Sequence, residues 1–337
     1  DSTNYLTHYH LAKSYRALRM FNRAIESDSV AIKLKPDFLL SRLDLGLLHL
    51  ERKNYDAAIS TLKEVIARKP QHALAHFYIG QCYLAKGLKD STEFFFAQSC
   101  VLDSTNYNSF LTLGTFYYQN HRYEEGISSF RQAGSIDPWS PEVFHKLGDG
   151  YSKRQEHRKA VVSYFRAVQL GDSSVQALSG LGSAFFSLQA YDSAIVYFNR
   201  AASRDSSDPL LHYNLGVALS RKDKHREAIS EFEKASRLSR TDFTANIFVQ
   251  MGINYYHIHQ LKKARNSYRR ALEITPQYPV ALYNLAVLYD AGLHDEKSAR
   301  RYYKEYLAAA KEDQSQGDLV GIVQKRIEAL SRKPKTR

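Results

Sequence analysis

The stretch "VFHKLGDGYSKRQEHRKAVVSYFRAVQL" (residues 143–170) carries the pattern that decides the fold. Gly148 is followed twelve residues later by Ala160 and nineteen later by Ala167, and the aromatic Tyr164 lies between these two alanines. A small residue equivalent to Gly148 recurs along the chain in steps of 34 residues, with one step of 36. The recurring small residues are Ala12, Gly46, Gly80, Gly114, Gly148, Gly182, Gly216, Gly252 and Ala286.

The period of 34 residues predicts a tandem array of paired antiparallel helices. Residues three and four apart share one face of a helix, so the recurring positions mark a buried stripe on each helix of a pair. Small residues let the two backbones approach, and the rings fill the space between successive pairs. An array adds neighbours without enlarging one core, so 337 residues need not divide into several ordinary domains.

The two stretches 143–170 and 210–238 resemble the consensus of the tetratricopeptide repeat in nearly every defining position. The resemblance implies an all-α fold, a right-handed superhelical α-solenoid of antiparallel helix pairs. It extends over nine tandem repeats in residues 1–312, followed by a C-terminal capping helix (313–331) and a basic tail (332–337). The repeats are predicted to begin near residues 5, 39, 73, 107, 141, 175, 209, 245 and 279.

Three departures from the repeat pattern predict local irregularities. The first repeat has His8 at a large apolar position and Asp28 at the aromatic position, which predicts a looser core there. The link 239–244 carries two extra residues, and the turn of the ninth repeat carries one. In the capping helix, one face is predicted to bury Leu319, Ile322, Val323, Ile327 and Leu330.

No motif in the chain predicts catalysis or a bound cofactor. Phosphate-binding loops, nucleophile elbows, dinucleotide-binding glycines and zinc-protease motifs are all missing from the sequence. The pairs His8/His10 and His257/His259 are two residues apart, so their rings point to different sides of a helix and predict no metal site. Cys82 and Cys100 are predicted to be separate thiols, roughly 10 Å apart along a helix pair.

The charge balance is basic, with 47 Lys plus Arg against 35 Asp plus Glu and a net charge of +12. Such a balance would suit an anionic partner, but a solvated convex face that happens to be basic is the favoured interpretation. The basic residues are scattered over several turns without an aromatic platform, so nucleic acid is not favoured as a partner. No stretch approaches the roughly 20 apolar residues of a transmembrane helix.

The family resemblance implies that the first helix of each repeat lines a concave groove that binds peptides. The residues that it places there are Tyr9, Leu43, Leu47, Phe77, Tyr78, Gln81, Leu111, Tyr118, His145, Lys146, Asp149, Tyr213, Val217, Val249, Ile253, Tyr256, Tyr283 and Val287. Apolar contacts at both ends flank a polar centre at His145, Lys146 and Asp149. The alternative interpretation is that these side chains pack against neighbouring repeats. The Lys and Asn set of the family's carboxylate clamp is missing from the first three repeats.

The function predicted by the sequence is therefore a non-catalytic scaffold or adaptor for other proteins or peptides. The alternatives are a targeting or substrate-recruiting segment of a larger enzyme, or of a secretion or assembly complex. The pentapeptide "DSTNY" occurs at 1–5 and, in the same repeat register, at 103–107. The first copy indicates a chain cut from a longer one, or a first helix that begins almost at the terminus. The sequence leaves the compartment open: cytoplasmic, or exported or periplasmic with a leader removed before Asp1.

Overall fold

A computed structural model describes residues 4–239, 243–310 and 317–331, and every regular element within these ranges is helical. The chain divides into two compact units, Asp1–Gln155 and Glu156–Arg337. The first unit contains α1 (Tyr5–Ala17), α2 (Phe21–Leu34), α3 (Leu39–Glu51), α4 (Tyr55–Arg68), α5 (Ala73–Ala85), α6 (Lys89–Leu102), α7 (Tyr107–Gln119), α8 (Tyr123–Ile136) and α9 (Pro141–Lys153). The second contains α10 (His157–Gln169), α11 (Val175–Ser187), α12 (Tyr191–Arg204), α13 (Pro209–Arg221), α14 (His225–Leu238), α15 (Phe243–His257), α16 (Leu261–Ile274), α17 (Pro279–Val287), the π-helix η1 (Leu288–Gly292), α18 (Glu296–Ala309) and α19 (Gly317–Ser331).

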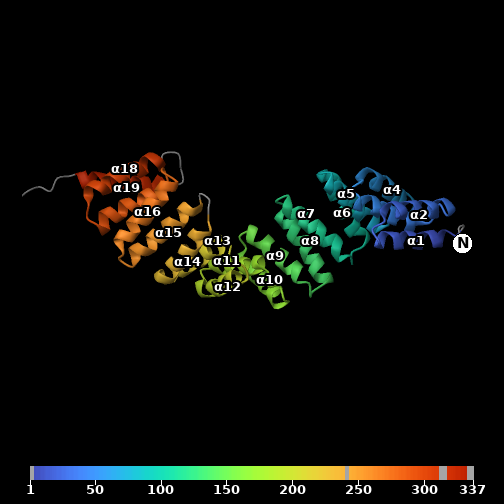
Figure 1. Ribbon diagram of the computed structural model, residues 1–337, viewed down its shortest axis with the longest axis horizontal. Helices are drawn as coiled ribbons and strands as arrows, with labels where there is room; N and C mark the ends of the chain where they lie inside the picture. Colours follow the sequence, from blue (N-terminus) through green and yellow to red (C-terminus); the bar gives the residue numbers. More distant parts are fainter. Residues whose placement is uncertain (1–3, 240–242, 311–316, 332–337) are drawn as a thin grey trace, which may run out of the picture. The chain divides into compact units, whose positions relative to one another are not determined.

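Within each unit, successive helices form hairpins, and each hairpin packs against the next (Figure 1). The turn inside a hairpin is tight because one residue adopts the left-handed conformation, as Lys53 does with φ 61°. The amide of Asn54 then donates to the carbonyl of His49 at 2.8 Å, which satisfies an open carbonyl at the end of α3. In the third repeat Gly87 occupies the same place with φ 72°. This all-helical architecture of tandem pairs confirms the predicted fold class.

The core is built from a small residue on one helix and a ring on the next. A Cβ atom placed on Gly80 would lie 2.6 Å from Cδ1 of Phe96, and one on Gly182 would lie 2.8 Å from Cδ1 of Phe198. Both rings are almost fully buried. The recurring glycines therefore allow close packing of the aromatic side chain within the same helix pair, whereas the sequence predicted these rings between successive pairs. Burial of each ring contributes about 1.5–3 kcal/mol.

The recurring pentapeptide "DSTNY" forms a turn and a helix cap in its second copy. The Asp103 carboxylate accepts a hydrogen bond from the Thr105 amide at 3.0 Å, and the Asn106 side chain accepts one from the Ser109 amide at 3.0 Å. Asn4 caps α1 in the same way, accepting from the Leu6 amide at 2.9 Å. Side-chain caps of this kind satisfy amides that a helix start leaves open. Residues 1–3 of the first copy lie outside the described residues.

The first repeat buries a carboxyl group where other repeats bury a ring. Asp28 is 1% exposed, and neither of its side-chain oxygens has a hydrogen-bond partner of ordinary length and angle among the described residues. Burial, aided by the charge of Asp44, raises the pKa of Asp28 to about 7; the nearby Ser41 hydroxyl and Arg16 oppose this shift. An unsatisfied buried polar group is costly, so the sequence-based prediction of a looser core in the first repeat keeps a physical reason.

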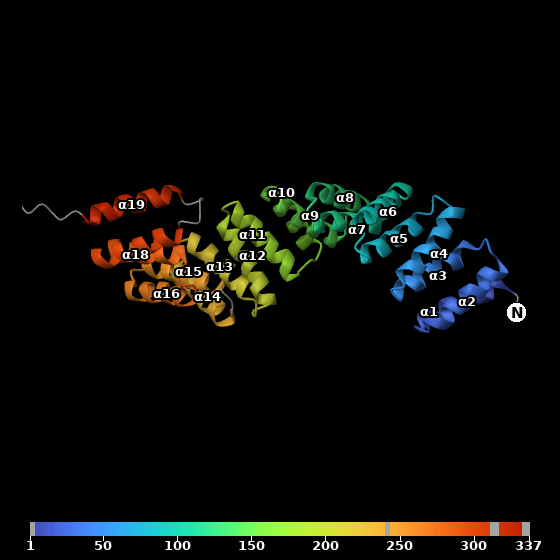
Figure 2. The same cartoon turned by 90° about the horizontal axis from the view of Figure 1, so that it is seen from above.

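At the C-terminal end, the extra residue of the ninth repeat is accommodated as the π-helical turn η1, which follows α17 directly. Helix α19 lies alongside α18 (Figure 2). Val323 is buried, while Leu319, Ile327 and Leu330 are partly buried against the same core. The prediction for Ile322 is wrong, since its side chain is 61% exposed. At about 100° per residue, position 322 lies beside the stripe formed by the other four residues and not within it.

Several sequence predictions fall outside the described residues. They concern residues 240–242 of the predicted irregular link, the start of the capping segment at 313–316 and the basic tail at 332–337. The two cysteines are described: Cys82 and Cys100 are both buried free thiols. Burial raises the pKa of Cys82 to about 11 and that of Cys100 to about 12, so neither is an activated nucleophile.

Candidate functional site

The structure separates the predicted groove residues into a buried group and a partly exposed group. Tyr9, Leu43 and Phe77 are each 8% exposed, and Val249 is fully buried. These four side chains belong to the packed interior and offer little area to another molecule. The half-buried group consists of Leu47, Tyr78, Gln81, Leu111, Tyr118, His145, Lys146, Asp149, Tyr213, Val217, Ile253, Tyr256, Tyr283 and Val287.

Some half-buried members already have partners in the neighbouring repeat. Asn246 donates a hydrogen bond to the Tyr213 hydroxyl at 3.1 Å, and the ring of Phe243 meets Tyr213 edge-on at 4.8 Å. The contacts of Tyr213 match the alternative interpretation, in which first-helix side chains join adjacent repeats. Tyr283 instead lies 5.6 Å from the ring of Tyr306 within its own ninth repeat.

The predicted polar centre is assembled within the first unit. His145 Nε2 and Asp149 Oδ1 are 3.8 Å apart on adjacent turns of α9. The pKa of Tyr118 on α7 is raised, first by burial and then by the charge of Asp149, which places the phenol and the carboxylate in one electrostatic environment. Lys146 is half-buried on the same helix. Asp149 therefore lies close enough to interact electrostatically with both His145 and Tyr118.

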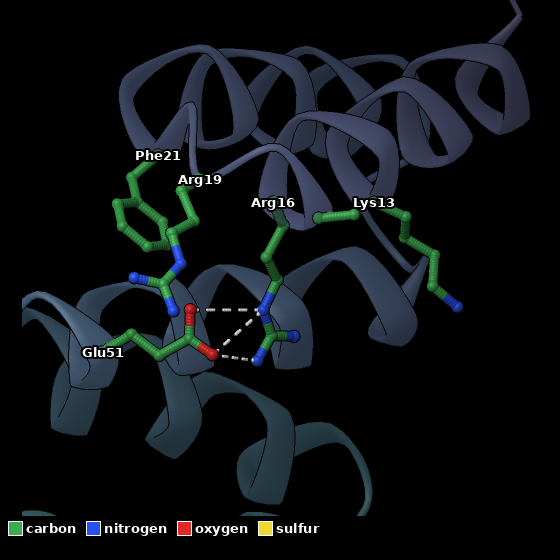
Figure 3. A pocket seen from close by; sticks show the side chains of 6 residues that line it. Lys13, Arg16, Arg19, Phe21 and Glu51 are labelled. Carbon is green, nitrogen blue, oxygen red and sulfur yellow. Dashed lines mark hydrogen bonds and ion pairs between the residues drawn. The ribbon is translucent and has the colours of Figure 1, made fainter.

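A cavity of about 460 Å³ opens at the C-terminal ends of α1 and α3 (Figure 3). It is lined by Lys13, Arg16, Ala17, Arg19, Phe21 and Glu51. The Glu51 carboxylate accepts hydrogen bonds from Arg16 Nε at 3.1 and 3.3 Å and a further one from Arg16 Nη2. Figure 3 shows both Arg16 and Arg19 pointing toward Glu51, while Lys13 points away from the pair.

An adjoining cavity of about 370 Å³ shares Arg19 and Phe21 with the first. Arg23 and Arg52 line it as well. Arg52 donates to the Asn22 side chain, and Arg23 lies over the ring of Tyr15 at 5.8 Å. Together the two cavities present five cationic side chains and the single carboxylate of Glu51. Their chemistry favours anionic groups.

The second unit contains a third cavity, of about 390 Å³, between α13 and α15. It is lined by Val217, Ser220, Arg221, Asp223, His225, Gln250, Ile253 and His257. Val217, Ser220, Asp223 and His225 occupy the repeat positions that Lys13, Arg16, Arg19 and Phe21 occupy six 34-residue repeats earlier. With the two extra residues of the 239–244 link, His257 corresponds in the same way to Glu51. Each unit thus has a cavity at the same place in its repeat.

Only part of these cavities was predicted from the sequence. Val217 and Ile253 are among the predicted groove contacts, whereas the charged residues of the last helical turn and of the hairpin turn are not. The turns rich in Arg, Lys and His could have indicated these charged residues. Such turns are also typical of a solvated surface without a binding role. Which of these side chains meet across two repeats depends on the packing of neighbouring hairpins.

Two negative findings apply to the described part of the chain. Among residues 4–239, 243–310 and 317–331, no group of three or more His, Cys, Asp or Glu side chains is arranged to hold a metal ion. Within the same ranges, none of the helices combines the length and apolar character needed to cross a membrane.

Comparison with known proteins finds matching family models and a similar curated protein. Models described as tetratricopeptide repeat match residues 9–71, 43–91 and 208–277, and one described as TPR repeat matches residues 182–223. Anaphase-promoting complex subunit 3 of Schizosaccharomyces pombe is 22% identical over 127 residues, which make up 38% of this chain and 19% of that protein. The chain therefore matches about a fifth of the length of this curated relative.

Two solved structures are similar in fold. YrrB, described as a TPR protein with an unusual peptide-binding site, has a TM-score of 0.52 and 18% identity, covering 56% of this chain and 95% of its own. The APC/C hetero-tetramer Cut9-Hcn1 has a TM-score of 0.50 and 16% identity, covering 94% of this chain and 75% of its own. At these identities the likeness concerns the arrangement of helices and not the residues that bind.

Proposed function

Because the chain belongs to the tetratricopeptide-repeat family, we propose that it is a non-catalytic scaffold that binds a segment of another protein along the first helices of its repeats. The observation that carries the proposal is the pair of cavities in equivalent repeat positions, one in each unit. Each opens between the first helices of neighbouring repeats. A peptide lying across successive first helices would meet these cavities in either unit.

The surface combines apolar and polar contacts in the way that peptide sites do. Leu47 and Leu111 in the first unit, and Val217 and Ile253 in the second, are half-buried apolar side chains on first helices. Charged and hydrogen-bonding groups lie at the ends of the same helices. Half-buried apolar side chains supply contact area, and the polar groups set orientation. The buried members of the predicted set support this surface from beneath.

The test replaces apolar surface residues with charge and measures which proteins co-purify. We expect Leu47→Glu with Leu111→Glu, or Val217→Glu with Ile253→Glu, to reduce recovery of bound proteins by about tenfold. A carboxylate in an apolar contact adds a desolvation cost to every complex formed there. The measurement is quantitative mass spectrometry of proteins retained by the intact chain from an extract of its source cells. Helical content by circular dichroism checks that the variants are folded.

The matched control introduces the same charges on second helices. Val101 on α6 and Val196 on α12 are 76% and 54% exposed, so Val101→Glu with Val196→Glu adds two carboxylates without touching the first-helix surface. Equal loss of partners in this control would contradict the proposal and indicate that the partners bind to the second helices. Phe77→Ala is unsuitable as a test because the ring is buried and its truncation also removes core packing.

A further inference from the structure

We propose that the cavity between α13 and α15 binds the side-chain carboxylate of a glutamate or aspartate in the bound peptide, with Arg221 and His257 as its principal donors. This inference rests on the proposed function and specifies its ligand chemistry. The cavity measures about 390 Å³, and Val217 and Ile253 supply apolar walls for the methylene groups of an acidic side chain. Ser220 and Gln250 add a hydroxyl and an amide to the lining.

A buried asparagine fixes one histidine of this cavity. Asn254 is fully buried, and its Nδ2 donates to the Gln250 carbonyl at 2.8 Å. Its Oδ1 is therefore the acceptor that faces His225 Nδ1 at 2.9 Å, so His225 carries a proton on Nδ1. The other nitrogen of the ring, Nε2, lies 3.7 Å from the Asp223 carboxylate. Both nitrogens of His225 thus face groups of the chain itself.

The fixed ring of His225 in turn orients His257. The two imidazoles stack with centroids 4.7 Å apart and planes inclined by 7°. Tyr256 meets His257 edge-on at 6.1 Å. In contrast to His225, the side chain of His257 makes no hydrogen bond or ion pair with a described residue. A positioned imidazole N–H on the cavity wall is therefore available to a ligand.

Arg221 provides the positive charge of the site. Its guanidinium forms no ion pair or hydrogen bond within the described parts of the chain. The one carboxylate in the lining belongs to Asp223, which is 93% exposed and associates with His225. An arginine beside an imidazole donor and without a carboxylate partner is complementary to an incoming carboxylate, because charge-assisted hydrogen bonds to guanidinium are strong and directional.

In the equivalent cavity of the first unit, a cation and a carboxylate of the chain itself are paired with each other. There the position of His257 is taken by Glu51, and its carboxylate binds Arg16 within the cavity (Figure 3). In the second unit an imidazole takes the place of this carboxylate and Ser220 takes the place of Arg16, while Arg221, one position further along α13, supplies the cation. The second cavity has no acid at the repeat position of Glu51, and its lining carboxylate, Asp223, is exposed and associates with His225, so a carboxylate of the ligand is the complementary group.

The experiment uses the intact chain and oriented peptide mixtures. Three nine-residue mixtures are random except for a fixed central residue, which is Glu, Gln or phosphoserine. We expect the immobilised chain to retain the Glu mixture about tenfold more than the Gln mixture, as expected for a charge-assisted pair. Arg221→Gln and His257→Gln are each expected to bring that ratio close to one. Circular dichroism verifies that the helical content of both variants is unchanged.

The control variant is Arg226→Gln, which removes the same charge from an exposed residue outside the cavity lining. An equal loss of the Glu preference in this variant would overturn the proposal, because it would indicate general surface charge. Stronger retention of the phosphoserine mixture than of the Glu mixture would also overturn it, in favour of a phosphate site. Selection of apolar sequences without a preference for Glu would refute this inference and leave the proposed function standing. No selection from any mixture would count against both.

Discussion

At the scale of single residues, the most consequential side chain outside the cavities is the buried carboxyl of Asp28. It replaces an aromatic ring of the repeat and has no hydrogen-bond partner of ordinary geometry in the part of the chain that the structure describes. The charged groups that influence it are Asp44, which raises its pKa, and Arg16, which lowers it, but burial is the largest cause of the shift to about 7. The folded chain therefore holds a proton at pH values where the unfolded chain has lost it.

This difference predicts how the first repeat responds to pH. Asp28 titrates near its ordinary value of 3.8 when unfolded and near 7 when folded. Since the folded form binds the extra proton, stability falls as pH rises from about 4 to 7 and is level above that. About three pKa units correspond to a loss on the order of 4 kcal/mol. Asp28→Asn should remove this dependence while keeping the side-chain shape.

The measurement is hydrogen exchange of the amides of α1 and α2 between pH 5 and pH 8, corrected for intrinsic exchange rates. Wild-type protection should decline over this range relative to that of Asp28→Asn. Ser41→Ala is a useful comparison, since Ser41 is the neighbouring hydroxyl and carries no charge. If wild type and Asp28→Asn lose protection in parallel, Asp28 is not the titrating group.

At the scale of secondary-structure elements, α19 depends on one ion pair as well as on apolar contact. Arg326 donates to Asp290 at 2.6 and 2.7 Å, and the Tyr303 hydroxyl donates to the same carboxylate at 3.1 Å. Asp290 belongs to η1, so the π-helical turn positions the carboxylate that holds α19. The hydrogen bond from Arg326 is the main cause of the lowered pKa of Asp290.

Arg326→Ala is expected to weaken the docking of α19 by about 1–2 kcal/mol, since Arg326 is half-exposed and the Asp290 side chain is mostly buried. Hydrogen exchange within residues 319–330 should rise accordingly, while α11 and α12 keep their protection. Because the pKa of Asp290 is lowered in the folded chain, its contribution is present at neutral pH and is lost as pH falls below about 4. Lys325→Ala, on the same exposed part of the helix, is the control. Equal effects of the two variants on exchange would show that the ion pair does not stabilise the docking of α19.

At the scale of the whole molecule, stability is distributed along the array. Helix pairs contact their neighbours in sequence, and the core consists of clusters shared by adjacent hairpins. Such an array is described by repeat stabilities and neighbour interfaces, so a local change should remain local. One ring, that of Phe198 on α12, packs against Gly182 of α11 and belongs to the large cluster of the second unit.

Phe198→Ala is therefore expected to lower the free energy of opening by about 3–5 kcal/mol in α11 to α13. The helices of the first unit, for example α5 and α6, should keep their hydrogen-exchange protection. The measurement is residue-resolved exchange of the full chain. Phe94→Ala, which removes a 55% exposed ring, is the matched control and should have little effect. A uniform loss of protection over both units would show that the chain unfolds as one cooperative body.

The period of 34 residues was sufficient to predict the all-helical fold, the helix pairs and the buried stripe on each helix. These features follow from local periodicity, which the order of residues records directly. The second copy of "DSTNY" is likewise a local device, since its Asn106 caps the helix that follows it.

The candidate site was less predictable because it depends on contacts between repeats. Tertiary packing decided that Phe77 and Val249 are buried, that Ile322 faces solvent, and that His225 stacks on His257 across two repeats. It also decided that Glu51 pairs with Arg16 inside one cavity, while Arg221 lines the equivalent cavity of the second unit without an ion pair to a described residue. The sequence by itself determined which residues recur and therefore which helices form. The three-dimensional packing decided which side chains meet, because exposure and pairing depend on how one hairpin lies against the next.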